Sequence, residues 1–229
     1  MITDRDVPQL RRLWQEAFGD TDAFLDKFFS VGFSPRRCNC IREGEKIVAT
    51  LYWFDCTWKG KKAAYIYAVA TSKALRGKGL CRQLMENTHR LLHSQGYCGA
   101  ALVPAQESLS EMYQKFGYRS FCPVKKATIS ANALSAATAI SPAEYEALRT
   151  TFAGENALLQ DQAALDFLAT YGNFYKGEDL LICGYWEGDI FHLEEAFCLH
   201  APSVQPLQAM YLPLDGSEDL PDYFAIPLN

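Results

Sequence analysis

The chain has 229 residues, of which 49% are hydrophobic, and it carries a formal net charge of −5 at pH 7. This length allows one large domain or two modest ones, and this hydrophobic content supports a sizeable core. The acidic balance argues against nucleic acid as the main partner, because nucleic-acid-binding domains usually carry a basic face.

Cysteine usage and hydropathy indicate a reduced, cytoplasmic protein. The 8 cysteines are scattered, with no Cys-x-x-Cys pair and no histidine at zinc-finger spacing. We therefore expect free thiols and no metal site. Residues 1–12 are charged where a signal peptide would be apolar. No segment approaches the ~20 apolar residues of a bilayer span, so we expect no membrane partner.

The N-terminal part of the chain predicts two helices followed by an antiparallel meander. Residues 4–18 place Leu10, Trp14 and Phe18 on one helix face, and Gly19 ends this helix. The other predicted elements are a second helix from Asp20 or Thr21 to about residue 29, and strands at residues 38–42, 47–58 and 62–71.

Residues 65–94 predict a strand, a basic glycine-containing loop and an amphipathic helix. The start of such a helix gathers unpaired backbone N–H groups and the positive end of the helix dipole. Gly77 and Gly79 let a ligand approach the backbone, since neither has a Cβ. Arg76 and Lys78 add positive charge. This combination suits a pyrophosphate, and the alternative is a glycine-rich turn before an ordinary helix.

Two familiar phosphate loops do not fit this segment. The Walker pattern needs four residues between its glycines, whereas one residue separates Gly77 from Gly79. The dinucleotide fingerprint needs a third glycine where Arg82 stands, and an acidic residue ~20 residues further on, where residues 94–101 have none. Neither familiar phosphate loop therefore accounts for this segment.

A second stretch, residues 97–118, predicts a strand, a turn and a short helix. The strand at residues 100–103 should run parallel to the strand that ends at Thr71, because a helix joins the two in a βαβ unit. Ser108 and Glu111 form a capping box at the start of the short helix.

Both stretches resemble the GNAT-type N-acetyltransferase superfamily. The loop is similar to its motif A, Arg/Gln-x-x-Gly-x-Gly/Ala, in which Arg76 and Gly79 fit and Cys81 stands where the family has glycine or alanine. Residues 112–118 are similar to its Leu-Tyr-x-x-x-Gly-Phe segment and lie at the expected distance. The resemblance covers roughly residues 1–128.

The resemblance implies an α/β (α+β) fold with a mixed, mostly antiparallel sheet flanked by helices. It implies transfer of an acetyl group from acetyl-CoA to an amine of a small molecule or peptide. Tyr113 would be the general acid for the departing thiolate, and a backbone N–H before the loop would polarise the thioester carbonyl. The residues that the resemblance assigns to acetyl-CoA are Val69, Ala70, Thr71, Arg76, Gly77, Lys78, Gly79, Leu80, Cys81 and Gln106.

The base that takes the proton of the amine has no fixed motif in the family. Glu107, Tyr67 and Asp55 are candidates by their positions in the chain. Cys81 faces the site in this interpretation, so an acyl-cysteine route is a further alternative.

Residues 131–229 predict a second, smaller and partial GNAT-like domain. Residues 131–140 are small and uncharged, which is typical of a linker. Two helices and a hairpin then repeat the element order of the first part, so we expect domains at residues 1–130 and 131–229. The proline-rich tail predicts edge strands at residues 210–214 and 223–228.

This tandem order loosely resembles acetyltransferases of the enhanced-intracellular-survival type, in which the C-terminal carboxylate reaches the first active site. The resemblance implies that the carboxylate of Asn229 acts as the base.

A rival from another class is a non-catalytic sensor module that binds acyl-CoA. Transfer of an aminoacyl group or a longer acyl chain, the identity of the acceptor, and assembly into a homo-oligomer stay open at this point.

Overall fold

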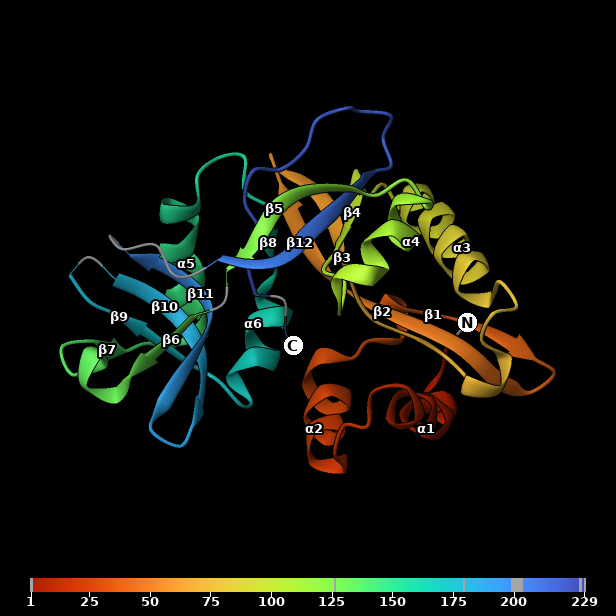
Figure 1. The fold of residues 1–229 in the computed structure, drawn as a ribbon, viewed down its shortest axis with the longest axis horizontal. Helices are drawn as coiled ribbons and strands as arrows, with labels where there is room; N and C mark the ends of the chain where they lie inside the picture. The colour runs from red at the N-terminus through yellow and green to blue at the C-terminus, as the bar shows by residue number, and fades with distance from the viewer. Residues whose placement is uncertain (1, 126, 179, 199–203, 227, 229) are drawn as a thin grey trace.

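Two β-sheets organise the chain (Figure 1). The computed structural model describes residues 2–125, 127–178, 180–198, 204–226 and 228. The strands of the first sheet are β1 (Cys38–Glu43), β2 (Lys46–Trp58), β3 (Lys61–Thr71), β4 (Gly99–Leu102), β5 (Arg119–Lys125), β8 (Leu159–Gln160) and β12 (Val204–Pro213). Those of the second sheet are β6 (Ala127–Ser130), β7 (Thr138–Ala139), β9 (Asn173–Lys176), β10 (Leu180–Glu187) and β11 (Ile190–Cys198). Within the described residues, the first sheet has the order β1-β2-β3-β4-β12-β5, with β8 on β2, and the second has the order β6-β11-β10-β9-β7.

Helices cover both faces of the first sheet. The α-helices are α1 (Val7–Phe18), α2 (Asp22–Lys27), α3 (Leu80–Ser94), α4 (Ser110–Gln114), α5 (Pro142–Ala153) and α6 (Gln162–Ala169). Short 3-10 helices span Asp4–Asp6, Pro35–Arg37, Lys73–Leu75, Glu107–Leu109 and Ala131–Leu134, and a π-helix spans Phe28–Gly32. Helices α1, α2 and α6 contribute to one hydrophobic core of the sheet, whereas α3 and α4 contribute to another. The mixed sheet, mostly antiparallel and flanked by helices, confirms the predicted fold class.

The two N-terminal helices are separated by a turn that places an acidic side chain inward. Gly19 ends α1 in the left-handed region, with a φ of 79°. Thr21 caps α2, because its side chain accepts a hydrogen bond from Phe24 N at 3.2 Å. Asp20 is therefore not the cap, and its Oδ2 accepts a hydrogen bond from Trp14 Nε1 at 2.7 Å.

The predicted βαβ unit is confirmed. Strands β3 and β4 are parallel, and their ladder pairs Ala64 with Ala100 and Tyr65 with Ala101. Beyond Tyr65, β3 continues without further pairing to a described residue of β4. The two strands therefore part at their C-terminal ends.

A bulge in β3 lies beside this opening. The β2–β3 ladder passes from the pair Tyr52 and Tyr67 directly to the pair Thr50 and Ala70, which leaves two β3 residues opposite one residue of β2. The first of the two, Ala68, has a φ of 49°, which is uncommon for a residue with a Cβ. Such a bulge turns the strand and redirects its side chains.

Strand β12 lies inside the first sheet, so the prediction of an edge strand at residues 210–214 is wrong. It pairs antiparallel with both β4 and β5, and Met210 and Tyr211 are fully buried. A Cβ at Gly99 of β4 would lie 1.9 Å from the Tyr211 hydroxyl oxygen, so the close approach needs glycine. Of the second predicted edge strand, Tyr223 makes an isolated bridge.

The part of the chain after residue 131 contributes to both sheets. The second sheet is built almost wholly from it, while β8 and β12 join the first sheet. The predicted division at residue 131 and the partial second copy of the fold stay predictions.

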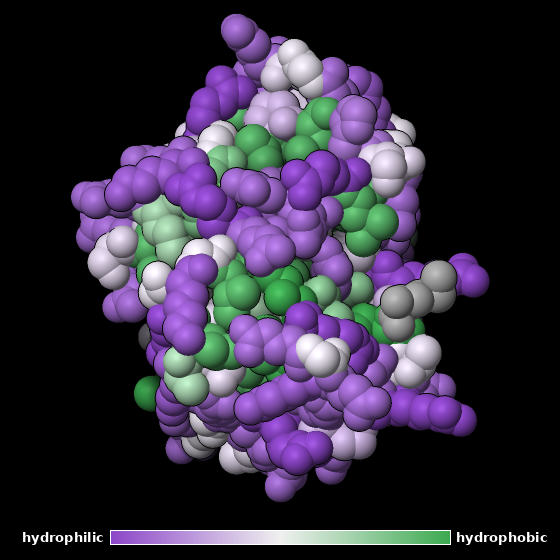
Figure 2. All heavy atoms as spheres, turned by 90° about the vertical axis from the view of Figure 1, so that its right-hand side faces the viewer, coloured by the Kyte–Doolittle hydropathy of each residue, from purple (hydrophilic) through white to green (hydrophobic). Residues whose placement is uncertain are grey.

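The surface beside α3 is mostly hydrophilic, with hydrophobic patches between the polar side chains (Figure 2). Of the helices in the described ranges, none combines the length and hydropathy that a bilayer span requires.

Candidate active site

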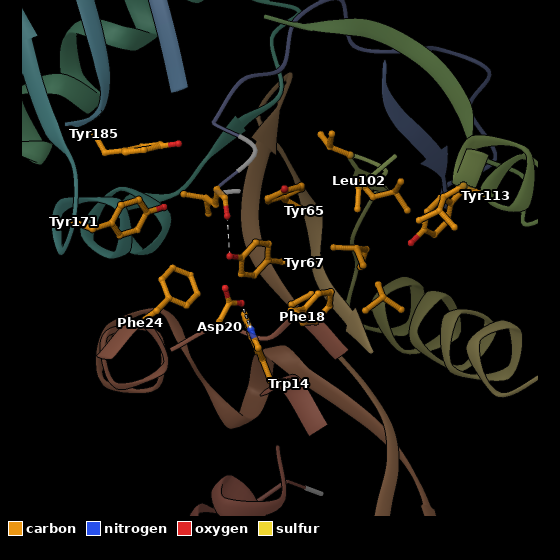
Figure 3. A pocket seen from close by; sticks show the side chains of 17 residues that line it. Trp14, Phe18, Asp20, Phe24, Tyr65, Tyr67, Leu102, Tyr113, Tyr171 and Tyr185 are labelled. Carbon is orange, nitrogen blue, oxygen red and sulfur yellow. Dashed lines mark hydrogen bonds between the residues drawn. The ribbon is translucent and has the colours of Figure 1, made fainter. Parts of the chain in front are cut away.

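A cavity of about 580 Å³ lies at the opening between β3 and β4 (Figure 3). Its lining comes from both faces of the first sheet. Tyr65 and Tyr67 belong to the core on the α1 side, whereas Ile66 and Val69 belong with the core on the α3 side. The opening therefore connects the α1 face and the α3 face of the first sheet beside β3.

The α3 side of the cavity is an apolar slot with one hydroxyl. Its walls are Ile66 and Val69 of β3, Leu102 of β4, and Leu109. Tyr113 of α4 closes the slot, and Figure 3 shows its hydroxyl on the cavity side. The slot can hold an extended, largely apolar chain.

The N-terminus of α3 lies at the end of β3, after the basic loop. Gly77 and Gly79 have φ values of 77° and 80°, which residues with a Cβ rarely adopt. The hydrogen bond from Gln83 N to Gly79 O, at 3.0 Å, is the first turn of the helix, so the amides of residues 80–82 have no partner within it. This geometry suits an anion, as the sequence predicts.

The two basic side chains of the loop are exposed. Arg76 Nε donates a hydrogen bond to Thr71 O at 3.4 Å, which folds the side chain back over the end of β3. Lys78 is exposed beside the glycines. Both are free to approach a negatively charged group at the start of α3.

Tyr113 is buried, with 7% of its surface exposed. Among the described residues, none makes a hydrogen bond to its hydroxyl, which is consequently available to a ligand. Burial raises the pKa of Tyr113, so the hydroxyl keeps its proton at neutral pH.

Of the other residues assigned to the cofactor, Val69 lines the cavity, while Ala70 and Thr71 are paired with β2. Cys81 is half-buried at the first turn of α3, and burial raises the pKa of its thiol. Because the thiolate is the nucleophilic form, this shift weighs against the acyl-cysteine route. Gln106 is exposed and lies outside the cavity lining, so its role stays a prediction.

The structure separates the candidates for the base. Asp55 lies away from the cavity, where it accepts a hydrogen bond from Tyr97 and pairs with Lys62 at 3.3 Å. Glu107 is exposed and is not part of the cavity lining. Tyr67 does line the cavity.

The hydroxyl of Tyr67 donates a hydrogen bond to the backbone oxygen of Leu228 at 2.8 Å. Burial raises the pKa of Tyr67, and the negative charges of Asp20 and Glu194 raise it further. A phenolate base is therefore unfavourable at this position. Asn229 lies outside the described residues, and its neighbour Leu228 lines the cavity.

Except for Tyr67, the α1 side of the cavity was not predicted from the sequence. It consists of aromatic rings and one carboxylate, contributed by Trp14, Phe18, Asp20, Phe24, Tyr67, Tyr171 and Tyr185. Asp20 could have been singled out as the acidic residue beside the Gly19 helix stop, but the sequence left Asp20 and Thr21 equal as caps. Tyr171 directly follows α6, and Tyr185 lies in β10. No local sequence pattern predicts that either residue lines this cavity.

Comparison with known proteins identifies the fold. The model of a family described as an acetyltransferase (GNAT) domain matches residues 1–121. No curated protein matches the chain.

Solved structures of GNAT proteins are similar along most of the chain. A GCN5-related N-acetyltransferase from Anabaena variabilis has a TM-score of 0.68 at 13% identity, covering 93% of this chain and 71% of that one. A putative acetyltransferase from Pyrococcus horikoshii has a TM-score of 0.66 at 13% identity, covering 98% and 92%. Eis1 from Mycobacterium abscessus has a TM-score of 0.65 at 10% identity, covering 94% and 73%. The similarity to Eis1 confirms, at the level of the fold, the resemblance to acetyltransferases of the enhanced-intracellular-survival type.

The family model covers more than half of the chain and includes β3, the loop, α3, β4 and Tyr113. The chain therefore belongs to the GNAT acetyltransferase family.

Proposed function

We propose that the protein moves an acetyl group from acetyl-CoA to an amine of a small molecule or peptide, with both molecules bound at once. The observation that carries this proposal is the cavity that joins the two faces of the first sheet beside the N-terminus of α3. A donor on the α3 side and an acceptor on the α1 side can meet at β3 without displacing each other.

The residues of the α3 side fit acetyl-CoA. The free amides of residues 80–82, with Arg76 and Lys78, suit a diphosphate. The apolar slot between β3 and β4 suits the pantetheine arm. When bound, the coenzyme supplies an activated acetyl thioester.

Two groups of the chain suit the chemistry of the transfer. The β3 bulge leaves Val69 outside the regular ladder, so its N–H is a candidate to stabilise negative charge on the thioester oxygen. As the C–N bond forms and the C–S bond breaks, Tyr113 would give its proton to the departing sulfur.

The proton of the amine must pass to a base, for which the Asn229 carboxylate stays our prediction. Leu228 supports it by lining the cavity one residue earlier. Appending one glycine after Asn229 should abolish turnover and leave the affinity for acetyl-CoA unchanged, since it moves the carboxylate but keeps Leu228. Unchanged turnover would reject this role.

Calorimetry with acetyl-CoA and thiol release over a panel of amines test the proposal together. We expect binding, and release of coenzyme A that depends on the amine. Arg76→Ala should weaken acetyl-CoA binding about tenfold, as expected for the loss of a charged contact to phosphate. Arg90→Ala is the matched control, because Arg90 is exposed on α3, away from the loop, and contacts Asn87.

Absence of acetyl-CoA binding would overturn the proposal. Binding without thiol release for any amine would favour the rival, a non-catalytic acyl-CoA sensor.

A further inference from the structure

Among its described lining residues, the α1 side of the cavity is an aromatic enclosure with Asp20 as its carboxylate. We propose that it selects an acceptor with a positive charge, an alkylammonium group that packs against the rings and pairs with Asp20. The inference rests on the proposed acetyl transfer for the reaction, but the binding itself can be tested without turnover.

The rings form a continuous chain of contacts around this part of the cavity. The centroids of Trp14 and Tyr67 are 5.7 Å apart, and those of Trp14 and Phe24 are 6.3 Å apart. Phe24 and Tyr171 follow at 6.1 Å, and Tyr171 and Tyr185 at 6.3 Å. Figure 3 shows these side chains around the left part of the cavity. Aromatic faces attract alkylammonium groups through their quadrupoles, most strongly where water is excluded.

Asp20 supplies the opposite charge inside this enclosure. Its Oδ2 accepts the Trp14 indole hydrogen bond at 2.7 Å, which fixes the orientation of both side chains. Among the residues that the structure describes, Trp14 alone makes a hydrogen bond to this carboxylate. The other oxygen, Oδ1, is consequently available to a ligand.

The charges around the cavity favour a cation. None of the described residues that line it is Lys, Arg or His. Asp20 and the buried Glu194 both act on the Tyr67 hydroxyl at the middle of the cavity. A positive charge on the ligand relieves this negative field, whereas a carboxylate or phosphate would be repelled.

A second polar atom lies in the enclosure. The Tyr171 hydroxyl oxygen is buried, and no described residue makes a hydrogen bond to it. Buried polar atoms are nearly always satisfied in folded proteins, so an unsatisfied one beside a cavity points to a ligand.

Two probes of similar shape test whether the charge of the ligand matters. The first is choline, and the second is its uncharged isostere, in which a tert-butyl group replaces the trimethylammonium group. Neither probe needs acetyl transfer to bind. We expect the protein to bind choline at least about tenfold more tightly than the isostere in calorimetry, the preference that a desolvated cation–π site gives.

Asp20→Asn and Phe24→Leu test the two parts of the site. The amide oxygen introduced by the first change would still accept the Trp14 hydrogen bond, and the leucine side chain introduced by the second would keep an apolar surface, so each variant should remain folded. Each should weaken choline binding about tenfold and leave the isostere unchanged. Asp189→Asn is the matched control for Asp20→Asn, because Asp189 is exposed in the turn between β10 and β11. It should bind choline as the unchanged protein does.

Equal affinity for choline and the isostere, or an Asp20→Asn variant that binds choline as tightly as the unchanged protein does, would overturn the inference. Preference for choline without thiol release for any amine would support the cation site and reject the proposed transfer. Thiol release without preference for choline would support the proposed transfer and reject the cation site.

Discussion

The hydroxyl of Tyr67 meets the backbone oxygen of Leu228 at 2.8 Å. The two residues are far apart in sequence, and both line the cavity between β3 and β4. The α1 side of the cavity is therefore built jointly by the part of the chain that matches the family model and by the segment around residue 228.

Replacing Tyr67 by phenylalanine removes this hydrogen bond and keeps the ring. We expect a loss of about 1 kcal/mol in the free energy of unfolding, as for a typical hydrogen bond. The KM for the amine should rise while the Kd for acetyl-CoA stays the same, because the change lies on the α1 side. Denaturant unfolding and steady-state kinetics measure these quantities.

Tyr175→Phe is the control for this substitution. It removes the hydrogen bond from Trp186 Nε1 to the Tyr175 hydroxyl, 3.2 Å, in the second sheet. Its unfolding free energy should fall similarly without a change in KM. A KM equally altered in both variants would contradict the placement of Tyr67 in the acceptor site.

Tyr113→Phe tests the general acid. We expect kcat to fall by about 100-fold or more, the usual contribution of acid catalysis, with unchanged affinity for acetyl-CoA. Because burial raises the pKa of Tyr113, the unaltered enzyme should keep its active, protonated acid up to at least about pH 10, the ordinary tyrosine value. A Tyr113→Phe variant with ordinary kcat would assign the residue to packing alone.

His89 makes stability depend on pH. Burial lowers the pKa of His89 to about 4, whereas an unfolded histidine has a pKa of about 6.5. Between these values the unfolded chain binds a proton that the folded chain does not, so stability falls as the pH falls. We expect a loss of about 2 kcal/mol in unfolding free energy from pH 7 to pH 5 through this group.

Denaturant unfolding of His89→Gln at both pH values should show a correspondingly smaller loss. The glutamine side chain could keep a hydrogen bond to the Tyr118 hydroxyl, which His89 Nε2 contacts at 3.0 Å. His93→Gln, on the exposed side of the same helix, should behave as the unchanged protein. An equal pH dependence in His89→Gln would refute the assignment.

A buried ion pair holds the end of the chain against α5 and the second sheet. Arg149 Nε and Glu195 Oε2 are 2.6 Å apart, with side chains 1% and 0% exposed. The Tyr223 hydroxyl donates to Glu195 Oε1 at 2.8 Å. Arg149→Ala should cost about 3–5 kcal/mol in unfolding free energy, because it leaves a buried carboxylate without its partner. Lys176→Ala, which breaks the exposed pair with Glu144, should cost no more than about 1 kcal/mol.

The same network should affect the cavity at a distance. Arg149 Nη2 donates to Gln160 Oε1 at 2.7 Å, and Gln160 Nε2 donates to the backbone oxygens of Ala225 and Ile226. These residues directly precede the segment that reaches Tyr67. In Arg149→Ala we therefore expect a raised KM for the amine as well as lower stability.

The geometry on the α3 side of the cavity could be predicted from the sequence because local patterns determine it. Gly77 and Gly79 allow the positive φ values of the loop whatever surrounds them. The number of residues between Thr71 and the next strand is typical of a parallel crossover. Tyr113 follows in a short helix that begins at Ser110 without a side-chain cap, so the predicted capping box of Ser108 and Glu111 is wrong. Each signal lies within a few residues of the feature that it predicts.

The α1 side of the cavity depends on contacts between distant segments. Whether Asp20 or Thr21 capped α2 was decided by the Trp14 indole, which offered Asp20 a hydrogen bond. Tyr171 and Tyr185 reach the cavity through the packing of α6 and the second sheet. The position of β12 depends on its pairing with β4 and β5, which are distant in the sequence, so no local pattern predicts it.

Strand β12 also determines when during synthesis the protein can fold. The edges of β4 and β5 that it joins stay open until Pro213 has left the ribosome. A nascent chain that ends after β5 exposes two unpaired edges, which invite association with other chains. Such distant pairing also slows folding. The sheet that lines the cavity is thus complete only after residue 213 has been made, and a fragment cut after β5 should aggregate instead of working alone.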